Sequence, residues 1–388
     1  MIRHASRCCL VAFVLLSCAA ALAAATAPLA AVHWDDANQR WRDVATNPFA
    51  AAKKTDFSYE QANVTITYDD SAGTFRGTIV ATNLKPNFAY QIKLNGKPTH
   101  TWGADGDDWA NEQLGYNGRW WVDEYDSSGG WVSGWNSADT EYAYWKERNF
   151  TDGSNVYVFQ GYLLFENLVT DAAGKATKSF SLDSSFHVLW KTSQRTRKAN
   201  DSTAATYTIS ATTANAWYSQ NYATTKVSLY AEWEPGRPLP GKVRLPNGEY
   251  NVRLFLTEES FHETAAGSGS WATVMCDDFL AFSVKQSPPT LASVTAANAK
   301  SNGRYSISAT VNNPGPAASL TLKCVVAGAG GQQTLQQKTV NVPAAGTAKV
   351  TWTDAVGSSM KAGTYTATVT IVQTGESKAS NAFTVSRR

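Results

Sequence analysis

The sequence is short of cysteine. It has five cysteines in 388 residues, and three of them lie within the first 18 residues. Removal of the first 23 residues would leave Cys276 and Cys324, which fall in different predicted domains. Small exported domains usually pair their cysteines to staple a small core. Two single cysteines therefore exclude a disulfide-rich scaffold. They predict a buried thiol at Cys324, with an interdomain disulfide as the alternative.

After residue 23 the sequence has no apolar run long enough to span a membrane. The first 23 residues read as a secretory signal peptide. Arg3 and Arg7 precede an apolar stretch over 8–16, and Ala21-Leu22-Ala23 forms a cleavage site of the A-x-A type. We therefore predict an exported protein that is extracellular, at the cell surface or periplasmic. Leu15-Leu16-Ser17-Cys18 partly matches a lipoprotein cleavage site, so lipidation of Cys18 is the alternative.

Neither sign of charge is in excess, with 34 basic and 32 acidic side chains, but the two signs are unevenly distributed. Residues 288–388 contain nine Lys and Arg but only Asp354 and Glu376, a net charge of +7, which leaves −7 for residues 24–287. Opposite charges could support self-association through the two domains, but we favour the interpretation that both are solvated surfaces. The basic residues of 288–388 are scattered and its aromatic residues are few, which excludes a nucleic-acid-binding surface.

Long helical patterns are almost absent. Apolar side chains recur at every second residue from Asn63 onward, as in Val64, Ile66 and Tyr68, and this spacing is typical of strands. The fold class predicted is all-β, with two β-sandwich domains. The expected organisation is a signal peptide over 1–23, a leader or linker over 24–56, a large β-sandwich over 57–286 with an insertion over 96–155, and an immunoglobulin-like (Ig-like) β-sandwich over 287–388.

Two segments resemble known families. Val311-Asn-Asn-Pro-Gly315, Ala345-Gly-Thr-Ala-Lys-Val-Thr-Trp352 and Lys361-Ala-Gly-Thr-Tyr-Thr-Ala-Thr-Val369 follow one another as in the CARDB-type and related Ig-like adhesion modules of bacterial surface proteins. This resemblance covers the last hundred residues. In the first domain, Leu84-Lys-Pro-Asn-Phe-Ala-Tyr90 is similar to the fibronectin type III pattern, which implies a corner hydrogen bond from Tyr90. Both resemblances imply a fold and a surface location but no reaction.

Tryptophan is concentrated in the insertion. Seven of the fourteen tryptophans fall between Trp102 and Trp145, and the stretch 102–152 has eleven acidic but only three basic side chains. Carboxylates resist burial, so indole rings beside carboxylates favour an exposed face that binds sugars. The predicted ligand-binding residues are Trp120, Trp121, Asp123, Glu124, Trp131 and Trp135. The alternative is a small core in which these tryptophans pack against one another.

Metal and catalytic patterns in the sequence are incomplete. Asp105, Asp107 and Asp108 could offer oxygen ligands to calcium, but the rest of a twelve-residue calcium loop is missing, and a solvated acidic turn is the default. No motif singles out a nucleophile or a carboxylate pair, so we predict no enzyme activity and no cofactor.

The function predicted from the sequence is therefore exported and non-catalytic. We expect binding, adhesion or structural assembly at the cell exterior, with a glycan or another cell-surface polymer as the partner of the Trp-rich insertion. The alternatives are a secreted hydrolase of polysaccharides and a self-assembling surface-layer or filament component.

Overall fold

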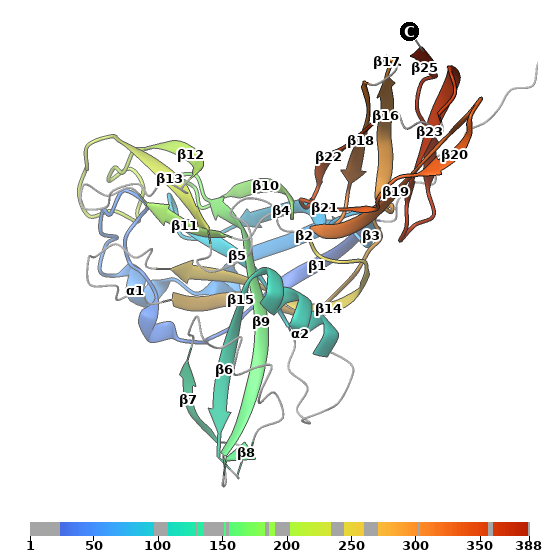
Figure 1. The fold of residues 1–388 in the computed structure, drawn as a ribbon. Coiled ribbons are helices and arrows are strands. Elements are labelled where there is room, and N and C mark those ends of the chain that lie inside the picture. Colours follow the sequence, from blue (N-terminus) through green and yellow to red (C-terminus); the bar gives the residue numbers. More distant parts are fainter. Residues whose placement is uncertain are drawn as a thin grey trace, which may run out of the picture.

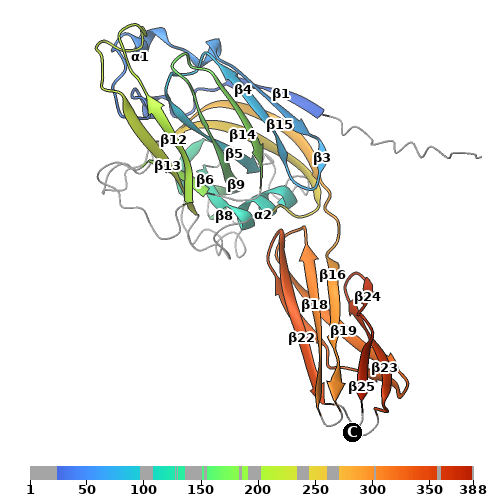
Figure 2. The same cartoon turned by 90° about the horizontal axis from the view of Figure 1, so that it is seen from above.

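The computed structural model describes residues 24–96, 108–126, 128, 130–135, 151–152, 155–182, 186–190, 202–233, 244–259, 271–300, 303–355 and 360–386. The predicted signal peptide, Cys18, Asp105 and Asp107 lie outside these residues. Strands dominate the described residues, and the helices are few and short. The prediction of an all-β protein with two sandwich domains is confirmed. Figure 2 shows the second domain following the first, with the chain passing from β15 to β16 between them.

The first domain is built on one large antiparallel sheet that folds back on itself (Figure 1). Its main strands run in the order β10 (Ala176–Ser181), β4 (Arg76–Thr82), β2 (Asn63–Asp69), β1 (Ala24–Ala31), β15 (Trp271–Val284), β14 (Gly248–Glu259), β5 (Ala89–Gly96), β9 (Asn155–Val169), β6 (Arg119–Tyr125) and β7 (Trp131–Trp135). Two short strands, β3 (Ser71–Ala72) and β8 (Thr151–Asp152), pair with β15 and β9. A separate small sheet has the order β11 (Phe186–Trp190), β13 (Thr225–Trp233) and β12 (Ser202–Ile209).

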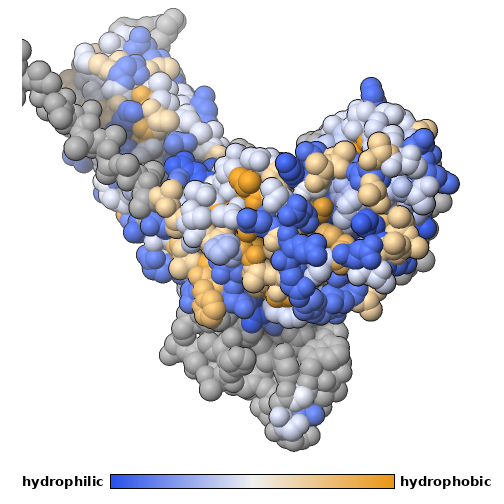
Figure 3. All heavy atoms as spheres, turned by 180° about the vertical axis from the view of Figure 1, so that it is seen from behind, coloured by the Kyte–Doolittle hydropathy of each residue, from blue (hydrophilic) through white to orange (hydrophobic). Residues whose placement is uncertain are grey.

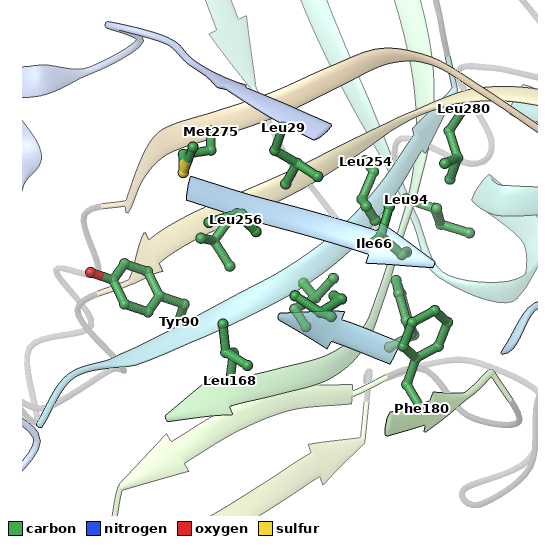
Figure 4. Close-up of a cluster of buried hydrophobic side chains, with 14 of the residues drawn as sticks. Leu29, Ile66, Tyr90, Leu94, Leu168, Phe180, Leu254, Leu256, Met275 and Leu280 are labelled. Carbon is green, nitrogen blue, oxygen red and sulfur yellow. The ribbon is translucent and has the colours of Figure 1, made fainter. Parts of the chain in front are cut away.

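The core of the first domain fills the space between the two halves of the folded sheet (Figure 4). In β2 the alternating residues Val64, Ile66 and Tyr68 are buried, as their spacing predicts. Tyr90, Ile92 and Leu94 of β5 and Leu254 and Leu256 of β14 face them from the other half. Burial of this apolar surface drives the two halves together.

Residues 24–56, predicted to be a leader, belong to the sandwich. Ala24–Leu29 of β1 pair with β2, and Ala30 and Ala31 pair with β15, so β1 joins the two halves of the sheet. The rest of this segment contains the 3-10 turn η1 (Asp36–Asn38), the short helix α1 (Lys53–Asp56) and, just after it, the 3-10 turn η2 (Tyr59–Gln61). The prediction of a leader was wrong because alanine and threonine give β1 only a weak alternating pattern. The backbone of β1 nevertheless pairs with β2 on one side and with β15 on the other.

A buried ion pair attaches this segment to the sheet. Lys85, in the turn before β5, and Glu258, in β14, are both fully buried, and the Lys85 Nζ lies 2.6 Å from the Glu258 Oε1. The Lys85 Nζ also donates to the Arg40 carbonyl at 2.7 Å, and the Arg40 N–H donates to the Glu258 Oε2 at 2.5 Å. The Tyr59 hydroxyl donates to the Glu258 Oε1. Both partners of the pair are therefore hydrogen-bonded within the protein.

Tyr90 makes the corner hydrogen bond that the fibronectin type III resemblance implies. Its hydroxyl accepts from the Lys85 N–H at 3.0 Å and lies 3.1 Å from the Tyr59 hydroxyl. Each domain also has a tyrosine whose hydroxyl donates to a backbone carbonyl upstream. Tyr250 donates to the Pro246 carbonyl, and Tyr365 donates to the Lys361 carbonyl, each at 2.9 Å and each four residues upstream. Such corners are typical of Ig-like sandwiches.

The predicted insertion extends the large sheet. The helix α2 (Asp108–Asn117) leads directly into β6, which pairs with β9 along its whole length, and β7 pairs with β6. Ala110 and Leu114 of α2 are part of the first domain's core. The described part of the insertion is therefore integrated in the sandwich.

The second domain is a sandwich of two sheets around its own core. One sheet has the order β16 (Thr290–Ala297), β18 (Arg304–Asn313) and β22 (Gly346–Ala355). The other has the order β17 (Ala299–Lys300), β25 (Phe383–Ser386), β23 (Gly363–Ile371), β19 (Ala318–Gly328) and β20 (Gly331–Thr334), with β21 (Lys338–Val342) and β24 (Ser377–Ala379) at its margins. Among the described residues, no helix is both long and apolar enough to cross a membrane.

The two cysteines of the described domains are unpaired and buried. Burial raises the pKa of the Cys324 thiol to about 12, and it also raises the pKa of the Cys276 thiol, beside Asp278. The prediction of a buried thiol at Cys324 is confirmed, and the alternative of an interdomain disulfide is wrong.

We expect neither thiol to react with iodoacetamide at neutral pH while the protein is folded, because the thiolate is the reactive form. Mass spectrometry should show no label on the folded protein and a label on both cysteines in denaturant. Rapid labelling of the folded protein would contradict the burial of these thiols.

Candidate functional site

Exposed apolar residues do not mark a binding surface. The exposed large apolar side chains of the described residues are scattered over separate elements: Trp34, Val80, Phe279 and Val372. Seen from behind, the described surface is mostly hydrophilic, with small separate apolar patches (Figure 3). Scattered exposed apolar residues are normal for a soluble surface. The unusual feature is a set of polar side chains that are buried.

These polar side chains lie on one face of strands β15, β14, β5, β9 and β6. Residues that pair across neighbouring strands point to the same side of a sheet. Tyr90, Ile92 and Leu94 of β5 point into the core, so Gln91, Lys93 and Asn95 point to the opposite side. We call this opposite side the polar face. The register places two buried apolar residues on it, Leu164 and Cys276. Its other residues include Gln91, Lys93, Asn95, Arg119, Trp121, Gln160, Tyr162, Asn167, Arg253, Phe255, Thr257, Trp271 and Thr273.

A row of four uncharged polar residues crosses the polar face. Thr273 of β15 pairs with Thr257 of β14, Thr257 pairs with Gln91 of β5, and Gln91 pairs with Asn167 of β9. Their exposed fractions are 5%, 1%, 0% and 2%. Four strands from distant parts of the chain thus bring amides and hydroxyls into one line. We call these four residues the polar row.

The amides on the polar face have atoms without hydrogen-bond partners. Both the Oε1 and the Nε2 of Gln91 are buried and unpartnered, as is the Oδ1 of Asn95. A buried amide without a partner costs about 1–3 kcal/mol in protein mutational data, and such groups are rare in native structures. A ligand with both donors and acceptors would supply the missing partners.

Two tryptophan rings meet on the same face. Trp121 of β6 and Trp271 of β15 are half-buried, and their ring centroids lie 5.0 Å apart in an edge-to-face arrangement. The sheet order separates β6 from β15 by three strands, so the sheet curls to bring the two rings together. The polar face is therefore curved inward at this point.

One end of the polar face is closed by the small sheet. Ala89 of β5 packs with Ile209 of β12 and with Val227 and Leu229 of β13 in a separate apolar cluster. Ala89 is two residues before Gln91 on the same face of β5. This cluster thus borders the polar face beside Gln91 and packs the small sheet against the large one.

The predicted ligand-binding residues divide into three groups. Trp120 is only 1% exposed, because α2 lies over it and its ring packs where Gly115 has no side chain. It is a packing residue, so its predicted role in an exposed sugar-binding face is wrong. Trp121 lies on the polar face. The backbones of Asp123, Glu124, Trp131 and Trp135 lie in β6 and β7, and their side chains lie outside the described part of the structure.

The calcium candidates gain no support from the structure. Asp105 and Asp107 lie outside the described residues, and Asp108 begins α2. In the described part of the chain, no group of three or more His, Cys, Asp or Glu side chains comes together in a way that could hold a metal ion.

The sequence reasoning missed most of the polar face. Gln91, Asn167, Thr257 and Thr273 sit in alternating strands, where a polar residue normally indicates a solvent-exposed side. Nothing local to these residues shows that the solvent side is buried. Trp271 lies far from the Trp-rich stretch in sequence, and only the fold brings it to Trp121.

Comparisons with known proteins give no family. No protein-family model matches the chain, and no curated protein matches it. Among solved structures, a Bacteroides uniformis β-glucuronidase is 12% identical, with a TM-score of 0.17 over 79% of this chain, and this chain spans only 26% of that enzyme. A tetra-tandem repeat from the extending region of a large adhesion protein is 12% identical, with a TM-score of 0.18, and the match covers 84% of this chain and 81% of that one. At these scores the similarities support no assignment.

We expect replacement of Gln91 by methionine to stabilise the first domain. Methionine has a similar length and no polar atoms, so the free energy of unfolding should rise by about 1–3 kcal/mol, the cost of an unpartnered buried amide. Urea denaturation followed by circular dichroism measures this change.

The matched control is Asn313→Leu in the second domain. Asn313 is also a buried amide, but its Nδ2 donates to the Pro316 carbonyl at 2.5 Å and its Oδ1 accepts from the Gly315 N–H at 3.1 Å. Its replacement should lower the stability of the second domain by about 1–3 kcal/mol. A Gln91→Met protein that is destabilised to the same extent would show that Gln91 is a structural residue.

Proposed function

We propose that this chain is an exported, non-catalytic binding protein of the cell exterior, and that its polar face binds a polysaccharide. The observation that carries the proposal is Gln91, an amide that is fully buried and unpartnered in the middle of the polar row. A structural amide would be expected to find partners in the protein. The Gln91 amide keeps hydrogen-bonding capacity for a ligand, which must displace the groups that cover it because Gln91 has no exposed surface.

The chemistry of the polar face suits a sugar chain. Sugar hydroxyls both donate and accept hydrogen bonds, and the Gln91 amide can do both at once. The Asn95 Oδ1 is a free acceptor. Trp121 and Trp271 add aromatic surface against which the apolar C–H side of a sugar ring can pack.

The same residues favour binding over hydrolysis. Hydrolysis of a glycosidic bond needs two carboxyl groups placed on either side of it. The polar row consists of amides and hydroxyls, which do not ionise near neutral pH. Glu258, the buried carboxylate of β14, faces the opposite side of the sheet and is paired with Lys85.

The proposals of export and of a role for the second domain are supported by the sequence alone. The charged start, apolar stretch and A-x-A site over 1–23 favour export. The resemblance of the last hundred residues to Ig-like adhesion modules supports a role of the second domain as a spacer or docking unit outside the cell.

The test is a tryptophan fluorescence titration of the purified chain with a neutral β-glucan, a neutral mannan and a polyuronate. We expect at least one of these to change the emission in a saturable way. Gln91→Met should bind that polymer about tenfold more weakly, since one lost hydrogen bond is worth roughly 1–1.5 kcal/mol. Trp121→Leu should bind more weakly as well.

The control is Trp217→Leu, because Trp217 packs against Phe49 and Phe57 at the core cluster of the domain. It should leave the affinity unchanged. Equal affinities of the wild type and the Gln91→Met protein would exclude the polar row as the binding site. No saturable change with any polymer would count against glycan binding as a whole.

A further inference from the structure

Lys85 and Glu258 are enclosed together and surrounded by aromatic rings. Both side chains have an exposed fraction of 0%. Four aromatic rings surround the Lys85 Nζ. The distances from the Nζ to the ring centroids are 4.1 Å for Trp41, 5.4 Å for Phe88, 5.6 Å for Tyr59 and 5.9 Å for Phe57. We infer that the Lys85 amine and the Glu258 carboxyl condense to an amide bond, which links the turn before β5 covalently to β14.

Burial favours the neutral form of the Lys85 amine. Condensation needs a neutral amine and a protonated carboxyl, whereas the pair in water would be ammonium and carboxylate. Loss of hydration lowers the pKa of Lys85, and this effect exceeds the opposing attraction of Glu258. Transfer of one proton along the 2.6 Å hydrogen bond from the Lys85 Nζ to the Glu258 Oε1 converts the ion pair into the neutral pair. In a medium of low polarity this costs far less than it does in water.

The hydrogen bonds of Glu258 distinguish its two oxygens. The Oε2 accepts from the Arg40 N–H at 2.5 Å, so this donor stabilises the negative charge that develops on Oε2 when the amine attacks the carboxyl carbon. The Oε1 accepts from the Tyr59 hydroxyl, which makes it the better leaving oxygen. The attacking nitrogen and the leaving oxygen are already in contact, an arrangement that replaces a bimolecular encounter.

The atoms of the step balance without any further reactant. The Lys85 nitrogen forms a bond to the Glu258 carboxyl carbon, and the bond from that carbon to Oε1 breaks. The protonated Oε1 takes one more proton from the attacking nitrogen and leaves as water. The product is a neutral amide and one water molecule, and no group is oxidised or reduced.

The surrounding groups also suit the product. The Arg40 carbonyl, which accepts from the Lys85 Nζ at 2.7 Å, can accept from the new amide N–H. The Arg40 N–H can donate to the new amide carbonyl. Condensation therefore removes two buried charges, which are costly to hold away from water, and keeps their hydrogen bonds.

The test is the mass of the purified chain in denaturant, measured when fresh and after long incubation. We expect a mass lower than the sequence mass by one water. Trypsin does not cut between Lys85 and Pro86, so a missing cleavage there has no meaning. The informative product is a branched peptide in which Gly77–Lys93 is joined to Leu254–Lys285, and fragmentation should locate the link at Glu258 rather than at Glu259 or Glu263.

The matched control is Lys85→Arg, which keeps the positive charge but cannot form this amide. It should have its full sequence mass. Tyr59→Phe, which loses the hydroxyl that donates to Oε1, should show a smaller linked fraction at early times. The proposal is overturned if wild-type protein keeps its full mass and yields the two peptides separately, or if the loss of water persists in Lys85→Arg. The mass of the wild type decides the question even if a variant fails to fold.

Discussion

The first domain depends on a charge pair that has no access to water. Lys85 and Glu258 lie far apart in sequence, and burying either one alone would be prohibitive, so each must be placed with all its hydrogen bonds made. The partners come from three further places: the backbone of Arg40, the ring of Trp41 and the hydroxyl of Tyr59. This requirement explains why the chain between β1 and β2, which has little regular structure, nevertheless packs closely on the sheet.

Buried polar groups on the two sides of the same strands differ in their hydrogen bonding. On the core side, Glu258 of β14 is satisfied on both oxygens. On the polar face, Gln91 of the neighbouring strand β5 is satisfied on neither amide atom. A fully satisfied cluster specifies one packing arrangement, whereas unsatisfied groups add cost without specificity. The first cluster therefore specifies how the strands pack, whereas the polar row adds no such specificity.

Local patterns in the sequence predicted the strands well and the site poorly. The alternation of Val64, Ile66 and Tyr68 identifies β2 and its buried side. Tryptophan density pointed to Trp121, which is on the polar face, and equally to Trp120, which is buried. The polar row could not be found this way, because it exists only once the register of four strands is fixed.

The position of β1 has a mechanical consequence. Ala24 pairs with Asp69, and Ser71 pairs with Ser283, so the start of β1 and the end of β15 lie at the same end of the sheet. Tension applied through Ala24 and through the segment after Val284 would therefore peel β1 away one hydrogen bond at a time instead of shearing all of them at once. Leu29 is the one residue of β1 that is buried. This strand would therefore detach at low force, and the core of the domain would resist unfolding after it.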